Sequence, residues 1–126
     1  MYGMIKYVKQ QDGTLSDFDI AILENTIFTS INKCNEFKEP ASIVKSTSSR
    51  ITFTVISELE KKIAKNVLDA YSIPVSDIRE IVEKVFYDNG YHDTAMIYIK
   101  NEYEKIINRY KDNIKELEEK IRDKNI

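Results

Sequence analysis

The last third of the chain limits the possible folds most, because its apolar residues keep a helical spacing without a break. They recur every three or four residues at Met96, Ile99, Tyr103, Ile106, Tyr110, Ile114, Leu117 and Ile121. This spacing predicts one long helix that starts near 93–94 and continues toward the end of the chain. The steps approach a heptad repeat, with one four-residue irregularity between Tyr110 and Ile114. Six basic and five acidic residues from Arg109 to Lys124 make its outer face polar, so we expect the apolar stripe to pack on something.

The composition fits one mostly helical, soluble domain. A chain of 126 residues is long enough to form one domain with a hydrophobic core but too short for two domains. With only three Gly and two Pro, it has few residues that interrupt helices. The single cysteine, Cys34, cannot form an internal disulfide, and the N-terminus does not resemble a signal segment. Both features favour the reducing cytoplasm. No apolar run approaches the roughly 20 residues that span a bilayer, so no membrane association is expected.

The charge and the inventory of reactive residues argue against two broad functions. With 19 basic and 21 acidic residues the net charge is -2, so a nucleic-acid partner is disfavoured. One histidine and one cysteine cannot build a zinc ribbon. His92 has no companion nucleophile, and the carboxylates are spread along amphipathic segments. We therefore expect a protein without catalytic activity and without a metal site of its own.

The first half of the chain predicts a hairpin followed by a helix. Asp12-Gly13 is a hairpin turn signal between short β-prone segments at 4–9 and 14–18. Asp19 is placed to cap a helix that ends near 32–35. The apolar face of this helix is Ile20, Leu23, Ile27 and Ile31. Residues 36–50, with Pro40 and the Ser/Thr run at 46–49, predict a connection that holds at most a helical turn at 41–45.

The middle of the chain predicts two further helices. The first begins around 52–55 and runs to about Ala70, with a stripe of Val55, Leu59, Ile63 and Val67. A break follows at 72–75, and Ser76 is a candidate N-cap for the next helix. Its core face is Ile78, Ile81, Val82 and Val85. That helix ends at Asn89-Gly90, because glycine accepts the left-handed conformation.

Together these elements predict an α+β domain that is mainly α. A small N-terminal β-hairpin packs on a bundle of about four helices, and the last helix is extended. We expect the domain to span residues 1–102 and the C-terminal helical extension to span 103–126.

In the order of its elements and in several short motifs, the chain resembles the ATP-cone. These motifs are Asp12-Gly13, Phe18-Asp19, the segment from Ile78 to Val85, the segment from Gly90 to Asp93, Ala95, and Tyr98-Ile99. The resemblance covers about residues 4–100. It implies a nucleotide-binding regulatory domain, like those of ribonucleotide reductases and related regulators.

The resemblance also implies which residues face the nucleotide. These candidates are Lys6, Lys9, Gln10, Gln11, Asp12, Gly13, Asp19 and Lys100. Gln10 and Gln11 stand where the family has a Lys-Arg pair, Ile22 where it often has a lysine, and Asn101-Glu102 where Tyr-Arg is common. An ordinary hairpin turn and a helix N-cap at Asp19 are the alternative interpretations of the same residues.

Two functions follow from the resemblance. The first is a sensor of ATP or dATP, with or without Mg²⁺, that controls homo-oligomerisation or a larger reductase or regulatory partner. The alternative is a degenerate cone that binds no nucleotide and acts as a protein interaction module. The interaction residues would be Tyr103, Ile106, Tyr110, Ile114, Leu117 and Ile121. This stripe has three open interpretations: packing on its own domain, self-association as a short coiled coil, and a tether to a larger body.

Overall fold

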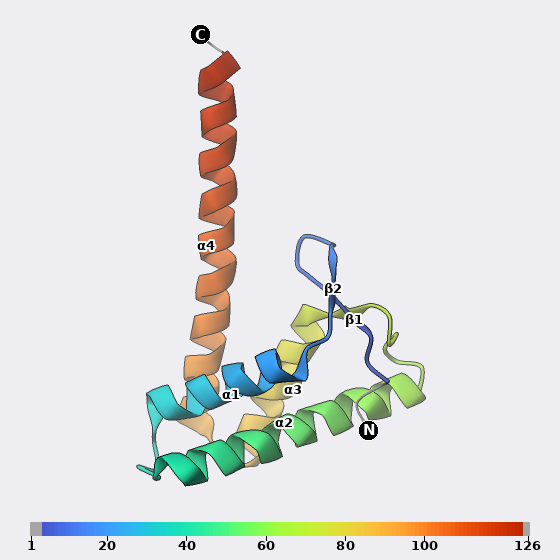
Figure 1. Cartoon of the computed structure of the whole chain (residues 1–126), viewed down its shortest axis with the longest axis vertical. Coiled ribbons are helices and arrows are strands. Elements are labelled where there is room, and N and C mark those ends of the chain that lie inside the picture. The colour runs from blue at the N-terminus through green and yellow to red at the C-terminus, as the bar shows by residue number, and fades with distance from the viewer. Residues whose placement is uncertain (1–3, 125–126) are drawn as a thin grey trace.

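The computed structural model describes residues 4–124. Along the chain the elements are β1 (Tyr7–Lys9), β2 (Leu15–Asp17), α1 (Ile20–Cys34), α2 (Ala41–Ala64), β3 (Ile73–Pro74), α3 (Val75–Asp88) and α4 (His92–Lys124). The predicted fold class is therefore confirmed: the protein is mainly α, with a small β unit near the N-terminus and a long last helix (Figure 1).

The N-terminal hairpin forms as predicted. β1 and β2 pair antiparallel, and the turn is closed by the Gln10 amide, which donates to the Thr14 carbonyl at 2.8 Å. Gly13 has a φ of +88°, a conformation in which an L side chain is strained. The carboxylate of Asp12 accepts hydrogen bonds from the amide and the hydroxyl of Thr14, at 3.0 and 2.6 Å. These bonds fix the hairpin tip.

A third strand, β3, completes the sheet in the order β2-β1-β3. It pairs parallel with β1, so that Val8 lies opposite Ile73. The sequence predicted no more than a helix break here, because two residues are too short to show an alternating pattern. The residue before a proline avoids the helical conformation, and the fully buried Ile73 anchors the strand in the core.

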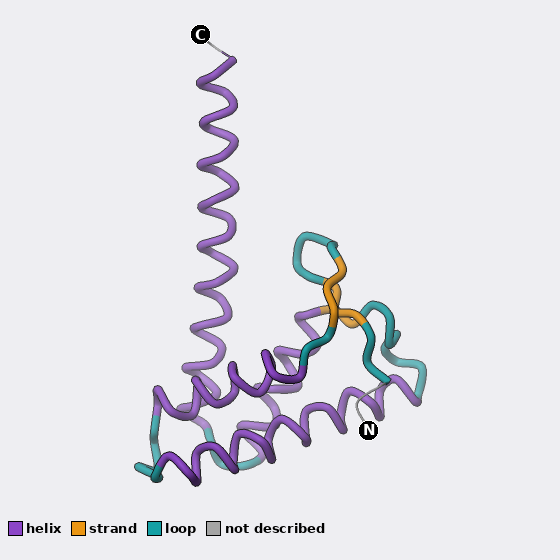
Figure 2. Tube along the Cα trace, in the orientation of Figure 1, coloured by secondary structure: helices purple, strands orange, loops and turns teal. Residues whose placement is uncertain are grey.

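Helix α1 begins and ends as predicted, and it runs antiparallel to α2 (Figures 1 and 2). The Asp19 carboxylate accepts a hydrogen bond from the Ala21 amide at 2.9 Å, which is the geometry of an N-cap. The helix stops at Cys34, and Asn35 takes a left-handed conformation with a φ of +43°. Its buried residues include Leu23, Ile27 and Ile31.

The prediction for α2 was wrong at both ends. The helix starts at Ala41 and includes the Ser/Thr run at 46–49 that predicted a connection, and it ends at Ala64 rather than Ala70. Buried hydroxyls in this part of α2 bond to the helix itself. Ser48 donates to the Val44 carbonyl and Thr52 donates to the Ser48 carbonyl, both at 2.7 Å. Because these polar groups are satisfied locally, burying them costs little.

Two smaller predictions in this region also need correction. Val67 lies beyond the end of α2 and is 65% exposed, so it does not extend the apolar stripe. Ser76 does not cap α3, because the helix begins at Val75 with Pro74 in the N-cap position and without a side-chain cap. The predicted core face of α3 is buried, and Gly90 after its end has a φ of +83°.

Helix α4 packs against α1 and α3 over its first part and then projects away from the body (Figures 1 and 2). Its first turn is held by Glu36, whose carboxylate accepts from the amide and hydroxyl of Thr94 at 3.1 and 2.8 Å. Tyr98 is buried in the core. From Ile107 to Lys124 every described residue is exposed. Among the helices of the described chain, none is long and apolar enough to cross a membrane.

Candidate functional site

A cavity of about 380 Å³ lies between the hairpin tip and α4, with α1 and α3 completing its walls. Its volume is within the range of about 300–1,000 Å³ that small-molecule sites usually have. The residues that line it are Gln10, Gln11, Asp12, Ile22, Thr26, Val75, Arg79, Glu102, Lys105, Ile106, Arg109, Tyr110 and Asn113. A smaller hollow of about 180 Å³ shares part of this wall and is also lined by Asp19 and Tyr98.

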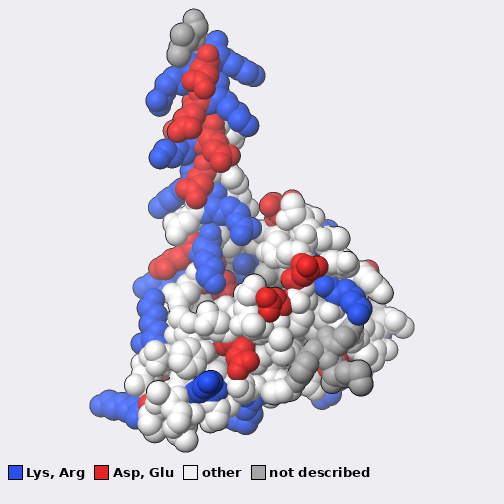
Figure 3. All heavy atoms as spheres, viewed as in Figure 1, with Lys and Arg blue, Asp and Glu red and all other residues white. Residues whose placement is uncertain are grey.

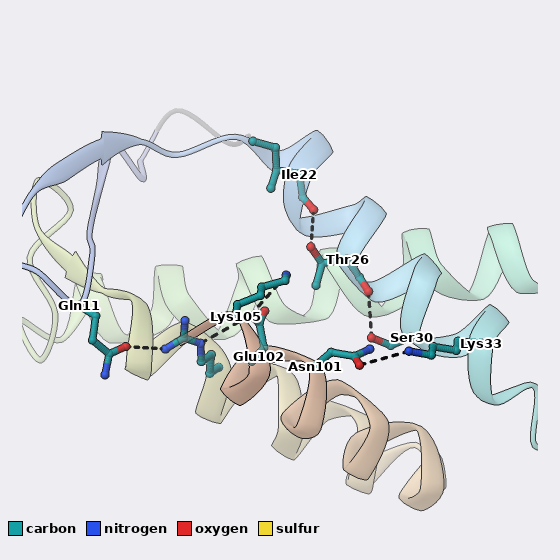
Figure 4. Close-up of polar contacts among 9 residues, drawn as sticks. Gln11, Ile22, Thr26, Ser30, Lys33, Asn101, Glu102 and Lys105 are labelled. Carbon is teal, nitrogen blue, oxygen red and sulfur yellow. Dashed lines mark hydrogen bonds and ion pairs between the residues drawn. The ribbon is translucent and has the colours of Figure 1, made fainter. Parts of the chain in front are cut away.

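Arg79 connects α3 to the hairpin tip across one wall of the cavity. Its Nη1 donates a hydrogen bond to Gln11 Oε1 at 2.9 Å (Figure 4). Its Nε lies 3.8 Å from Glu102 Oε2, which is an ion-pair distance but too long for a hydrogen bond. Among the described residues this buried Nε has no hydrogen-bond acceptor. A buried donor without an acceptor is uncommon in native proteins, and a small shift of the Arg79 side chain would present this donor to a bound acceptor.

The cavity carries more positive than negative charge. Arg79, Lys105 and Arg109 face two carboxylates, those of Asp12 and Glu102. Lys105 Nζ lies 3.4 Å from Glu102 Oε2 (Figure 4), so Glu102 is paired with two of the three cations. Arg109 is the cation left in excess, and it enters the cavity from a turn further along α4.

The charge of Arg109 also reaches the hairpin tip. The side-chain and backbone hydrogen bonds from Thr14 hold the pKa of the Asp12 carboxyl below its ordinary value, and the positive charge of Arg109 lowers it further. Asp12 is therefore ionised at neutral pH. The hairpin tip and α4 thus face each other with opposite charges across the cavity.

Apolar side chains and a buried phenol form the rest of the wall. Ile22 on α1 is 66% exposed and lines the cavity together with Val75 and Tyr110. Tyr98 lines the smaller hollow. Burial raises the pKa of Tyr98, and the neighbouring Glu102 carboxylate raises it further, so Tyr98 stays a neutral phenol at physiological pH.

Four of the eight residues that the resemblance implied line these two hollows. Gln10, Gln11 and Asp12 belong to the larger one, and Gln10 also to the smaller. Asp19 lines the smaller one while it caps α1, so its two alternative roles are compatible. Gln10 also donates to the Ser16 hydroxyl at 2.8 Å within the hairpin.

The other four lie outside both hollows. Lys9 lines an adjoining depression that shares Gln10, Gln11 and Val75 with the larger cavity. Lys6 is exposed, and its amide donates to the Ala70 carbonyl. Gly13 forms the hairpin turn, and Lys100 is exposed on α4. Their role in binding remains a prediction.

Sequence reasoning missed the cations that the structure brings to the cavity. Arg79 of α3 and Lys105 of α4 were given no role, and Arg109 was assigned to a mixed solvated face of the last helix. Glu102, Lys105, Arg109 and Asn113 do recur at helical spacing, and that repeat was the available signal. Ile106, which was predicted to belong to the interaction stripe, lines the cavity.

A β-hairpin placed over a helical bundle, with a cation-lined cavity between them, defines a small domain suited to an anionic ligand. The family model described as the ATP cone domain matches residues 6–105. The chain therefore belongs to the ATP cone family, and the resemblance found in the sequence is confirmed. Domains of this family are non-catalytic regulatory modules that bind adenine nucleotides. No curated protein matches the chain.

Proposed function

We propose that this protein senses ATP or dATP through the cavity between the hairpin tip and α4. The observation that carries the proposal is the half-buried side chain of Arg79, whose buried Nε lacks a hydrogen-bond acceptor, in a cavity with an excess of positive charge. In this arrangement the triphosphate lies against Arg79, Lys105 and Arg109. Occupancy then changes the contacts of the protein with further copies or with a larger reductase or regulatory partner.

Electrostatics supports this placement of the phosphates. A triphosphate carries about four negative charges, and charge-assisted hydrogen bonds are roughly twice as strong as neutral ones. Gln10 and Gln11 offer neutral donors where the family has a basic pair. The cations on α3 and α4 replace the attraction that the hairpin has lost. The negative charge of Glu102 weakens the attraction of the cavity for phosphates, and a phosphate would compete with this carboxylate for Arg79 and Lys105.

The apolar wall and the smaller hollow suit the remainder of the nucleotide. Adenine has flat apolar faces, and Ile22, Val75 and Tyr110 present matching surface. Asp19 offers carboxylate oxygens to a ribose hydroxyl in the adjoining hollow. A Mg²⁺ ion would arrive bound to the phosphates, as this ion usually does. No group of three or more His, Cys, Asp or Glu side chains among the described residues is suited to hold a metal.

Binding can be coupled to conformation through the hairpin. The Gln11–Arg79 bond holds the hairpin tip to α3, and a phosphate on Arg79 would compete with it. A nucleotide then shifts the position of the hairpin relative to α4 by as much as its affinities for the two positions differ. Sensing requires such a difference between ATP and dATP.

The alternative is a cone that has lost its nucleotide and acts as an interaction module. The neutral Gln10 and Gln11, the apolar Ile22 and the carboxylate of Glu102 in the cavity favour it. Calorimetric titration with ATP and dATP, with and without Mg²⁺, separates the two functions. The sensor binds, and at a hundred times the Kd it gains about 2.7 kcal/mol of stability. A folded protein that shows no heat and no stabilisation at millimolar nucleotide is the interaction module.

A further inference from the structure

The projecting half of α4 carries an uncovered apolar stripe. Its members are between 50% and 62% exposed: Tyr103, Ile107, Tyr110, Ile114, Leu117 and Ile121. Met96, one heptad before Tyr103, is 62% exposed as well. The stripe is therefore exposed to solvent even where α4 packs against the body of the domain. Apart from Ile106 and Tyr110 in the cavity wall, the described stripe therefore does not pack on its own domain.

With Ile107 in place of Ile106, the stripe is a regular heptad repeat. The successive steps are four, three, four, three and four residues, and the irregularity near Tyr110 disappears. Ile107, Ile114 and Ile121 occupy the a positions, and Tyr103, Tyr110 and Leu117 occupy the d positions. Ile106 belongs to the neighbouring g position, which faces the cavity. A strict heptad of this kind is the pattern of a coiled-coil seam.

We propose that two copies of this chain pair through this stripe as a parallel, in-register, two-stranded coiled coil. The stripe from Tyr103 to Ile121 is about 27 Å long at 1.5 Å per residue. An isolated helix of this length is only marginally stable in water, so packing against a partner helix would stabilise it. Isoleucine occupies every a position of the stripe, and β-branched residues at a favour two parallel strands.

The charges beside the stripe select the parallel orientation. In a parallel pair each g residue meets the e residue of the next heptad of the partner, so Ile106 meets Lys111 and Asn113 meets Glu118. Neither contact joins like charges. An antiparallel pair that uses the whole stripe sets e against e, and so brings Lys111 against Lys111 and Glu104 against Glu118. Like charges in such contacts are unfavourable, so the parallel pair is preferred.

Lys100 marks the start of the seam. It occupies the a position one heptad before Ile107, and a lysine there is unfavourable in the pair. The paired part therefore begins at Tyr103 and runs toward the C-terminus, away from the body. Acidic side chains form a column along this projection, with basic side chains on both sides of it (Figure 3), and such a mixed charged face is expected on the solvent side of a coiled coil.

The mass of the full chain in solution, measured without nucleotide, tests the pairing independently of the proposed function. We expect a dimer at tens of micromolar for the wild-type chain and a monomer for Ile114→Lys/Leu117→Lys, which places four lysines in the seam. Asp112→Lys/Glu119→Lys adds lysines on the opposite face of the helix and should stay dimeric. Circular dichroism follows the folding of each variant. A folded wild-type monomer, or a dimer that survives lysines in the seam, overturns the proposal.

Disulfide trapping tests the orientation. In a Cys34→Ser background, Leu117→Cys places two thiols across from each other in a parallel pair, within the Cα separation of about 4.4–6.8 Å that a disulfide needs. Oxidation should then link most chains through this position alone. In the antiparallel pair position 117 lies beside position 107 of the partner. Linking that requires a mixture of Leu117→Cys and Ile107→Cys chains would therefore contradict the parallel arrangement.

Discussion

At the scale of single residues, the guanidinium of Arg79 joins three parts of the molecule. It comes from α3, bonds to Gln11 of the hairpin and pairs with Glu102 of α4. Such a side chain cannot be removed without disturbing the protein itself. Arg109 is the better probe of the ligand, because it lines the cavity from an exposed position on α4.

We predict that Arg109→Ala weakens ATP binding about tenfold or more, since a hydrogen bond to a charged group contributes about 1.5–3 kcal/mol. Titration calorimetry measures the affinity. Arg122→Ala removes the same charge further along α4, outside the cavity, and should change the affinity less than about twofold. Equal losses in the two variants would mean that Arg109 acts through overall charge and not through contact.

Tyr98 predicts how stability depends on alkaline pH. Its pKa is raised by burial above the ordinary value of 10.0. Below pH 10 the phenol is protonated in both the folded and the unfolded chain, and its contribution is constant. Above that pH the unfolded chain releases a proton that the folded chain keeps, so the free energy of unfolding falls by up to about 1.4 kcal/mol per pH unit.

Tyr98→Phe lacks this proton and should lose stability less steeply between about pH 9 and 11. Urea unfolding of both proteins across this range measures the difference. The lysines and the other tyrosines are shared, so their titration affects both proteins alike. Parallel curves for the two proteins would show that the phenol of Tyr98 is not protected by burial.

At the scale of elements, the parts that sequence reasoning predicted were those with local signals. Asp12-Gly13 marked the hairpin, Asp19 marked the start of α1, and Gly90 marked the end of α3. The Ser/Thr run in α2 was wrongly predicted to be a connection. Buried hydroxyls in this part of α2 donate hydrogen bonds to carbonyls of the same helix, and whether they do so depends on the surrounding core. The cavity could not be predicted in detail, because it depends on contacts such as that between Gln11 and Arg79, 68 residues apart.

Gly90 provides a test at the element scale. Its φ of +83° is strained for other residues, and a Cβ there would meet no atom within 4 Å, so the backbone alone sets the cost. We predict that Gly90→Ala destabilises the domain by about 1 kcal/mol. Gly90→Asn should lose less, because asparagine tolerates the left-handed conformation. Denaturant unfolding measures the free energy of unfolding of the wild type and both variants. Equal values for all three proteins would contradict the role of Gly90 in ending α3.

At the scale of the whole molecule, α4 belongs to both proposed functions. Lys105 and Arg109 line the cavity, and Ile107 and Ile114 lie on the exposed stripe on nearly the opposite side of the same helix. Tyr110 belongs to both sets. A ligand that contacts Tyr110 would therefore act directly on a residue of the seam, which links occupancy to pairing.

If both proposals hold, the dimer and the monomeric Ile114→Lys/Leu117→Lys variant should differ in ATP affinity by about fivefold or more. Each dimer carries two sites, so by linkage saturating ATP then changes the dimer dissociation constant by the square of that factor, about 25-fold or more. Titration of each protein, with Asp112→Lys/Glu119→Lys as the control for added charge, measures the first quantity. Equal affinities in dimer and monomer would leave nucleotide binding and pairing uncoupled.

The most direct test of the central claim is a map of amide chemical shifts as ATP is added to the ¹⁵N-labelled chain. We predict that the largest changes fall on the hairpin tip at residues 10–14, on the first turns of α3 at 75–79 and on α4 at 102–113, and that they saturate together. Changes centred elsewhere, or a folded protein whose spectrum does not respond to millimolar ATP, would contradict the proposal that this cavity is a nucleotide site.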